Sequence, residues 1–142
     1  MLSKSSTYAI RAVLFLSLNS DDEKKFNPKS IAEIIDIPAP FLAKTLQELT
    51  KRNIISSRKG RNGGFYLTNA DKQNTMISIV AAIDGLEKFQ GCSLGLPVCD
   101  SENPCPIHHL VAPLRNKLVE ELTNKTIANF TKEIKDGHTH VF

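Results

Sequence analysis

The chain has 142 residues, of which 41% are hydrophobic and 23% charged, and its formal net charge is +3. These values are ordinary for one soluble globular domain, and no apolar run approaches the ~18–20 residues of a membrane span. Because Arg11 interrupts the apolar stretch from Met1 to Leu18 and no small-residue cleavage site follows, we expect no signal peptide, no membrane partner and a cytoplasmic protein.

A helix is predicted from Ser3 to Leu18. Serines at its start can act as N-caps, and apolar residues between Tyr8 and Leu16 recur at helical spacing. A helix this apolar is expected to be buried, in part against a second subunit. The polar segment 19–25 lacks a period and is expected to be a loop.

Two short helices are predicted between residues 27 and 52. Asn27 followed by Pro28 is typical of an N-cap and a first helical position, and this helix runs to Asp36. Prolines in the connection prevent it from continuing, and a second helix runs from about Pro40 to Arg52. Its apolar face is Leu42, Leu46 and Leu49. The pair matches a helix-turn-helix, although other helical hairpins give the same pattern.

A β-hairpin is expected next. Asn53 suits a left-handed helix end, residues 54–58 and 65–68 read as strands, and a glycine-rich basic tip (59–64) joins them. Helix, turn, helix and hairpin in this order outline a mainly α winged helix-turn-helix domain over residues 1–85. Its recognition helix is about 40–52 and its wing about 54–68.

The charge is concentrated in this region. Between Thr50 and Ala70 there are five cations and no acidic residue. A local basic strip suggests contact with a polyanion, although a solvated basic face would look the same. On a winged helix the expected partner is double-stranded DNA. The candidate base contacts near the start of the recognition helix are Phe41, which has a second interpretation as a core residue, Lys44 and Thr45. The candidate wing contacts to phosphate or the minor groove are Arg58, Lys59, Gly60, Arg61 and Gly63.

A cysteine-rich segment occupies residues 86–108, after a predicted helix over 74–84 that Gly85 closes. The candidate metal ligands are Cys92, Cys99, Cys105 and His108, with His109 adjacent. Three thiolates and an imidazole suit an iron–sulfur cluster or a tetrahedral zinc ion. A metal-free thiol switch is a third interpretation. An odd number of cysteines argues against a secreted disulfide framework.

The C-terminal part is predicted to hold a long helix over about 107–122, kinked or started by Pro113, and a short helix capped by Thr126. The long helix is expected to bury Val111, Leu114, Leu118 and Leu122. Residues 136–142 are expected to be a tail. The chain has no phosphate loop, dinucleotide fingerprint or Ser/His/Asp grouping, so we do not expect an enzyme.

Taken in order, these motifs resemble the Rrf2 family of bacterial winged-helix regulators, which includes IscR-, NsrR- and CymR-like proteins. The resemblance covers nearly the whole chain. The residues that carry it are Lys4-Ser5, Tyr8 to Ala12, Ile31-Ala32, Ile37, Phe41-Leu42, Lys44, Leu46, Leu49, the wing from Ser56 to Phe65, Ile83-Asp84-Gly85 and the Cys92, Cys99, Cys105 and His108 loop.

The resemblance implies a homodimer, paired through the long helix within 109–135, with each wing on one half of a palindromic operator. It also implies a redox-labile iron–sulfur cluster on the three cysteines. His108 matches the fourth ligand of IscR-like members, whereas others use a carboxylate where this chain has Thr7. The six-residue gap after Cys92 leaves 2Fe–2S and 4Fe–4S both open. The expected function is a homodimeric DNA-binding transcriptional regulator that the cluster modulates. Zinc-stabilised nucleic-acid binding and a metal-free thiol switch are the alternatives.

Overall fold

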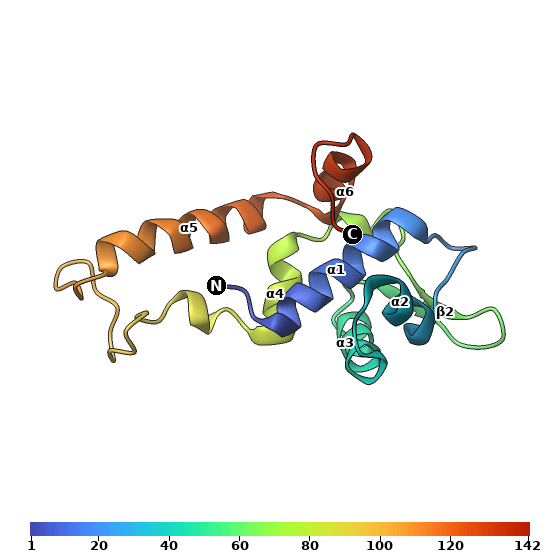
Figure 1. Ribbon diagram of the computed structural model, residues 1–142, viewed down its shortest axis with the longest axis horizontal. Coiled ribbons are helices and arrows are strands. Elements are labelled where there is room, and N and C mark those ends of the chain that lie inside the picture. Colours follow the sequence, from blue (N-terminus) through green and yellow to red (C-terminus); the bar gives the residue numbers. More distant parts are fainter.

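The first helix, α1 (Lys4–Asn19), runs through the middle of the molecule in the computed structural model, which describes residues 1–142 (Figure 1). The Ser3 side chain caps it by accepting a hydrogen bond from the Ser6 N–H. Ala12, Val13 and Leu16 are fully buried. Because α1 packs against α2 (Pro28–Ile35), α3 (Ala39–Lys51), α4 (Met76–Asp84) and α6 (Ile127–Lys135), its burial comes from the same chain.

The helix-turn-helix is formed as predicted. Asn27 caps α2, and Pro28 is its first residue. Asp36 ends α2 in the left-handed region, with φ of 53°, and this turns the chain into α3. The apolar face of α3 is fully buried at Leu42, Leu46 and Leu49.

The wing consists of two short antiparallel strands, β1 (Ser56–Arg58) and β2 (Gly64–Tyr66), with Ser57 opposite Phe65. Each strand is shorter than its sequence prediction. Phe26 adds a rung that was not predicted: its N–H donates to the Phe65 carbonyl at 3.0 Å, and its carbonyl accepts from the Phe65 N–H at 2.8 Å. The base of the wing is therefore fixed to the chain that enters α2.

The segment after the wing returns to the body. A 3₁₀ turn, η1 (Asp71–Gln73), leads into α4, which Gly85 closes with φ of 73°. A second 3₁₀ turn, η2 (Glu87–Phe89), then begins the cysteine-rich segment. The start of α4 is joined to the start of α6, since the Met76 N–H donates to the Lys125 carbonyl at 3.1 Å.

The long helix α5 (His108–Asn124) contains Pro113 and extends away from the body together with the cysteine-rich segment (Figure 1). Thr126 caps α6 through a capping box with Asn129. The helix α6 packs directly on α1. No helix is both long enough and apolar enough to cross a membrane.

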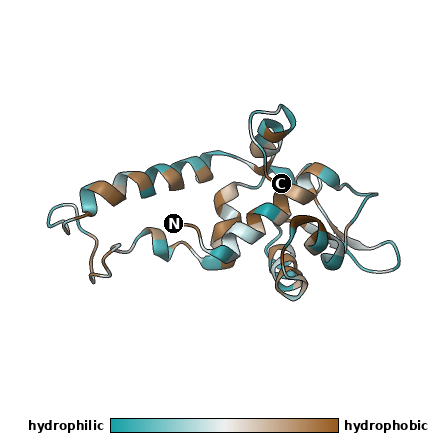
Figure 2. Ribbon diagram, viewed as in Figure 1, coloured by the Kyte–Doolittle hydropathy of each residue, from teal (hydrophilic) through white to brown (hydrophobic).

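The predicted burial of the long helix is wrong for Leu114 in a single chain, whereas Leu122 is buried and Val111 and Leu118 are half-buried. Leu122, at the end near the body, is 7% exposed, but Leu114 is 62% exposed and Leu110 is 70% exposed. The hydrophobic positions along α5 stand out in Figure 2. An amphipathic pattern requires a covering surface, and this chain leaves Leu110 and Leu114 uncovered, although Ala112 in the same half of α5 is buried.

Candidate functional site

A groove lies between α3 and the wing. Among the residues that line it, Lys51 comes from the end of α3, while Arg58 and Lys59 come from the wing; no acidic residue lines it. Arg58, Lys59 and Arg61 are exposed and form no ion pair. By contrast, Arg52 of the basic strip pairs with Glu48 at 3.0 Å. The groove can therefore attract a polyanion through unpaired cations.

The start of α3 presents one of the three predicted base contacts freely to solvent. Lys44 is exposed. Phe41 is half-buried and packs edge to face on Tyr8, with ring centroids 5.4 Å apart. Thr45 is 6% exposed and its hydroxyl donates to the Phe41 carbonyl at 2.9 Å. This burial leaves little of the Thr45 side chain for a base edge, and its predicted DNA contact stays a prediction.

The glycines of the wing tip shape the turn. Gly60 has φ of 105° and open space around it, and its carbonyl accepts a hydrogen bond from the Gly63 N–H at 3.0 Å. A Cβ added at Gly63 would collide with the Arg58 carbonyl oxygen. Hairpin geometry alone therefore accounts for Gly63, and its predicted DNA contact stays a prediction.

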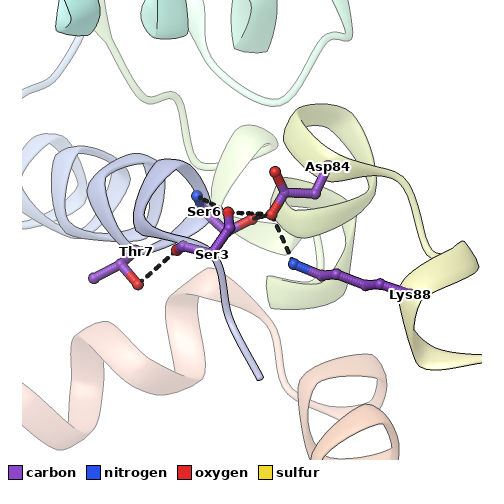
Figure 3. A network of polar contacts seen from close by, with 5 residues as sticks. All are labelled: Ser3, Ser6, Thr7, Asp84 and Lys88. Atoms are coloured by element: carbon purple, nitrogen blue, oxygen red, sulfur yellow. Dashed lines mark hydrogen bonds and ion pairs between the residues drawn. The ribbon is translucent and has the colours of Figure 1, made fainter. Parts of the chain in front are cut away.

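A polar network joins α4, α1 and η2 (Figure 3). The Asp84 carboxylate accepts hydrogen bonds from the hydroxyls of Ser3 and Ser6, the latter at 2.6 Å, and from Lys88 at 2.7 Å. Partial burial would raise the pKa of Asp84, but the hydrogen bonds from Lys88, Ser3 and Ser6 outweigh it and lower the pKa to about 2. Asp84 therefore stays anionic at neutral pH. In the same view the Thr7 hydroxyl donates to the Ser3 carbonyl at 2.9 Å.

The predicted metal ligands all border one cavity, at the start of α5. Cys92, Cys99, Cys105 and His108 all line one small cavity between the loop and the start of α5. The Cys99 sulfur lies 3.5 Å from His108 Nδ1. His109 is exposed and does not line the cavity. Of the two adjacent histidines, His108 is therefore the one oriented toward the cysteines.

The loop itself favours a thiolate at Cys92. The backbone N–H groups of Leu94 and Leu96 lower the pKa of the Cys92 thiol, and the Cys105 side chain adds to the effect. The thiolate is the form of cysteine that binds metals. All three cysteines are free and half-buried.

The donor set suits a soft metal centre, but the cavity is small. Its volume is about 10 Å³, which is roughly the space for one water molecule. No three His, Cys, Asp or Glu side chains are gathered closely enough to hold a metal ion as they stand. The loop must therefore rearrange to bind a metal, and more so for a cluster than for a single ion.

Arg115 was not predicted, and it also lines this cavity. Its Nη1 donates to the Gly91 carbonyl at 2.8 Å, and its Nη1 and Nη2 lie 3.9 and 3.8 Å from the Cys99 sulfur. A signal for it exists in the sequence. His108, Val111, Ala112 and Arg115 follow one another at i, i+3, i+4 and i+7, so they share one face of α5.

Comparison with known proteins identifies the family. The Rrf2 family, described as an iron-dependent transcriptional regulator, matches residues 2–133. A helix-turn-helix-type transcriptional regulator of Aquifex aeolicus is 33% identical over 133 residues, which make up 92% of this chain and 90% of that protein. The regulator IscR of Escherichia coli is 26% identical over 98% of this chain and 88% of its own length.

Solved structures share the fold. CymR, the global cysteine regulator of B. subtilis, superposes with a TM-score of 0.70 at 19% identity, covering 93% of this chain and 96% of its own. IscR of T. potens gives a TM-score of 0.72 at 19% identity, covering 98% of this chain and 91% of its own. The fold is therefore that of winged-helix regulators, and the chain belongs to the Rrf2 family of transcriptional regulators.

Proposed function

We propose that this regulator is a homodimer whose binding to a palindromic operator depends on an iron–sulfur cluster held by Cys92, Cys99, Cys105 and His108. One observation carries the proposal: three thiol sulfurs and one imidazole from a span of 17 residues line a single cavity. A cluster bound there would supply a redox-active centre that oxidation can alter or remove. The named relatives IscR and NsrR belong to the same group of regulators.

The DNA would bind across α3 and the wing. Lys44 is the exposed donor near the start of α3, which is where recognition helices read base edges. Arg58, Lys59 and Arg61 have no acidic partners and suit phosphate contacts, which orient the protein without reading sequence. The Phe41 ring belongs to the same surface and packs edge to face on the Tyr8 ring of α1.

The dimer would form through the first half of α5. Leu110 and Leu114 lie one turn apart and are the most exposed apolar side chains of the helix. Because exposed leucine pairs on a helix favour association, a second copy of α5 is the proposed cover. The spacing of the two wings would then match half-sites that lie about one helical turn of DNA apart.

The helix α4 would link the proposed DNA-binding surface to the cysteine loop. This helix packs on α3 and on α5, and Asp84 at its end holds both the start of α1 and Lys88 of η2. A rearrangement of the cysteine loop would therefore act on the end of the helix that packs on the recognition helix.

Anaerobic purification tests this proposal. A coloured protein with iron and acid-labile sulfide, lost when the three cysteines are replaced by alanine, is the expected result. A colourless protein that takes up neither iron nor sulfide on reconstitution would contradict it.

A second candidate is a zinc-stabilised DNA-binding protein, and the small cavity favours it. Three thiolates and one imidazole complete a tetrahedral zinc site, and about 10 Å³ suits one ion better than a cluster. Elemental analysis of the purified protein separates the two candidates, because zinc without sulfide supports only the second.

A further inference from the structure

We propose that Arg115 is a positioning residue that ties the state of the cysteine loop to α5. The inference rests on the proposed function, since it gives Arg115 a role at the metal site proposed there. Arg115 would hold the loop against the helix and would interact more strongly with a loaded site than with an empty one.

The first support is that one guanidinium holds two distant points of the loop. Gly91 precedes the cysteines and Cys99 lies in their middle, yet both contact Arg115, at 2.8 Å for the Gly91 carbonyl and 3.8 Å for the nearest Cys99 sulfur contact. A planar guanidinium presents its donors in a fixed fork. Its contacts therefore set how the loop lies on α5.

The second support is an unpartnered buried donor. The Nε of Arg115 is buried and forms no hydrogen bond, the one buried side-chain nitrogen or oxygen in the protein in this condition. A buried donor without an acceptor is unfavourable. Because Arg115 lines the cavity, a metal-bound thiolate or inorganic sulfide in the site could accept this hydrogen bond.

The third support is charge. Arg115 takes part in no ion pair. Metal binding requires thiolates, so loading would convert Cys99, whose sulfur lies 3.8 Å from the guanidinium, into a metal-bound thiolate. Hydrogen bonds to charged acceptors are stronger than those to neutral ones. Arg115 would therefore distinguish the two states, as a coupling residue must.

The contact between Arg115 and the loop also lies next to the proposed dimer face. Leu114, in the proposed dimer face, is the neighbour of Arg115 in the sequence. A change in the contacts of Arg115 would therefore shift the helix that is proposed to pair. A structural change in one cysteine loop would therefore reach the second subunit through α5.

The test uses the full chain with three substitutions. Arg115→Met removes the charge and the fork, and Arg115→Lys keeps only the charge. Lys117→Met is the matched control, because it removes a charge from an exposed position of the same helix, 64% exposed at the side chain. Circular dichroism and thermal unfolding establish that each apo protein is folded.

The first readout needs no metal. The alkylation rate of the Cys99 thiolate by a bulky maleimide is obtained from the pH dependence of the reaction in the reduced apo protein, followed by mass spectrometry, so that the lost positive charge does not mask a change in access. This rate should rise several-fold in Arg115→Met and stay unchanged in Lys117→Met. Arg115→Lys should lie between the two. An unchanged rate in Arg115→Met would overturn the inference that the guanidinium holds the loop.

The second readout uses reconstituted protein. Iron release to a chelator should be about tenfold faster in Arg115→Met, as expected when a partner of a metal ligand is removed, and the loaded and apo forms should differ less in DNA affinity. Wild-type release and an unchanged difference would overturn the role of Arg115. A wild-type protein without iron would instead contradict the proposed function, and the alkylation result would still decide the role of Arg115.

Discussion

Ser6 donates a 2.6 Å hydrogen bond to Asp84, which joins the first turn of α1 to the end of α4 (Figure 3). The same carboxylate oxygen accepts from Lys88 in η2 at 2.7 Å. The winged-helix body and the start of the cysteine-rich segment therefore meet at one anionic group.

Replacing Asp84 by asparagine should destabilise the protein at neutral pH. The pKa of Asp84 falls from 3.8 to about 2 on folding, so its stabilisation is complete above pH 3.8 and is lost as the pH falls through about 2. We expect a loss of about 1–2 kcal/mol at pH 7, after allowance for screening. Urea unfolding at a series of pH values measures it. Glu102→Gln, in an exposed loop, serves as control; equal effects of both variants at pH 7 would contradict the prediction.

Replacing Lys44 by alanine should weaken binding to the preferred DNA site by about 1–3 kcal/mol, because a base contact would be lost. The loss should be much smaller on unrelated DNA. Fluorescence anisotropy with both duplexes measures it. The control is Lys135→Ala, which also removes one positive charge but lies on α6 rather than α3. An equal loss of affinity in both variants would argue against base reading by Lys44.

Replacing Lys59 by alanine should weaken binding to all sequences alike. A phosphate contact releases counterions, so the slope of log affinity against log salt should fall by about one. A salt titration of the variant and the wild type provides the measurement. An unchanged slope would show that the wing tip does not touch phosphate.

Cys92 should react faster with iodoacetamide in the native apo protein at pH 7 than in the unfolded chain. Folding normally protects a cysteine, but here the backbone N–H groups of Leu94 and Leu96 lower the pKa of the thiol and so raise its thiolate fraction. Peptide mass spectrometry after timed alkylation follows the reaction. Slower alkylation in the native state would be the opposite result.

Replacing Leu114 by glutamate should convert a dimer to a monomer without unfolding the chain. Leu114 is 62% exposed in the single chain, so the charge disturbs only a surface that a second copy would cover. Sedimentation velocity reports the mass. Asn116→Glu places the same charge on α5 away from the leucine pair, and it should remain dimeric. A monomeric wild type would refute the dimer.

Local signals made most of the fold predictable. Asn27, Asn53 and Thr126 each mark a helix boundary through a cap or a left-handed φ, and these preferences depend on neighbours in the chain. The burial of Thr45 could also have been predicted from the sequence. It lies three residues after Leu42 and four before Leu49, on the buried stripe of α3.

The remaining features depend on contacts between distant parts of the chain. Phe26 pairs with Phe65 across the wing, and Arg115 reaches back to Gly91, 24 residues earlier. Neither pairing leaves a local pattern, although helical spacing from His108 places Arg115 on the face of α5 that lines the cavity. The amphipathic spacing of α5 indicated correctly that Leu114 belongs to an apolar face, but spacing does not say whether the same chain or another covers that face.

The dependence of DNA binding on the cysteine site can be measured in one preparation. DNA selected from a random pool by the anaerobically reconstituted protein is titrated with the loaded protein, with the chelated apo protein, and with a variant in which Cys92, Cys99 and Cys105 are alanine. The loaded form should differ from the other two by at least about tenfold in Kd, within the usual range of allosteric coupling. Equal Kd values for all three would contradict the proposal that this site controls operator binding.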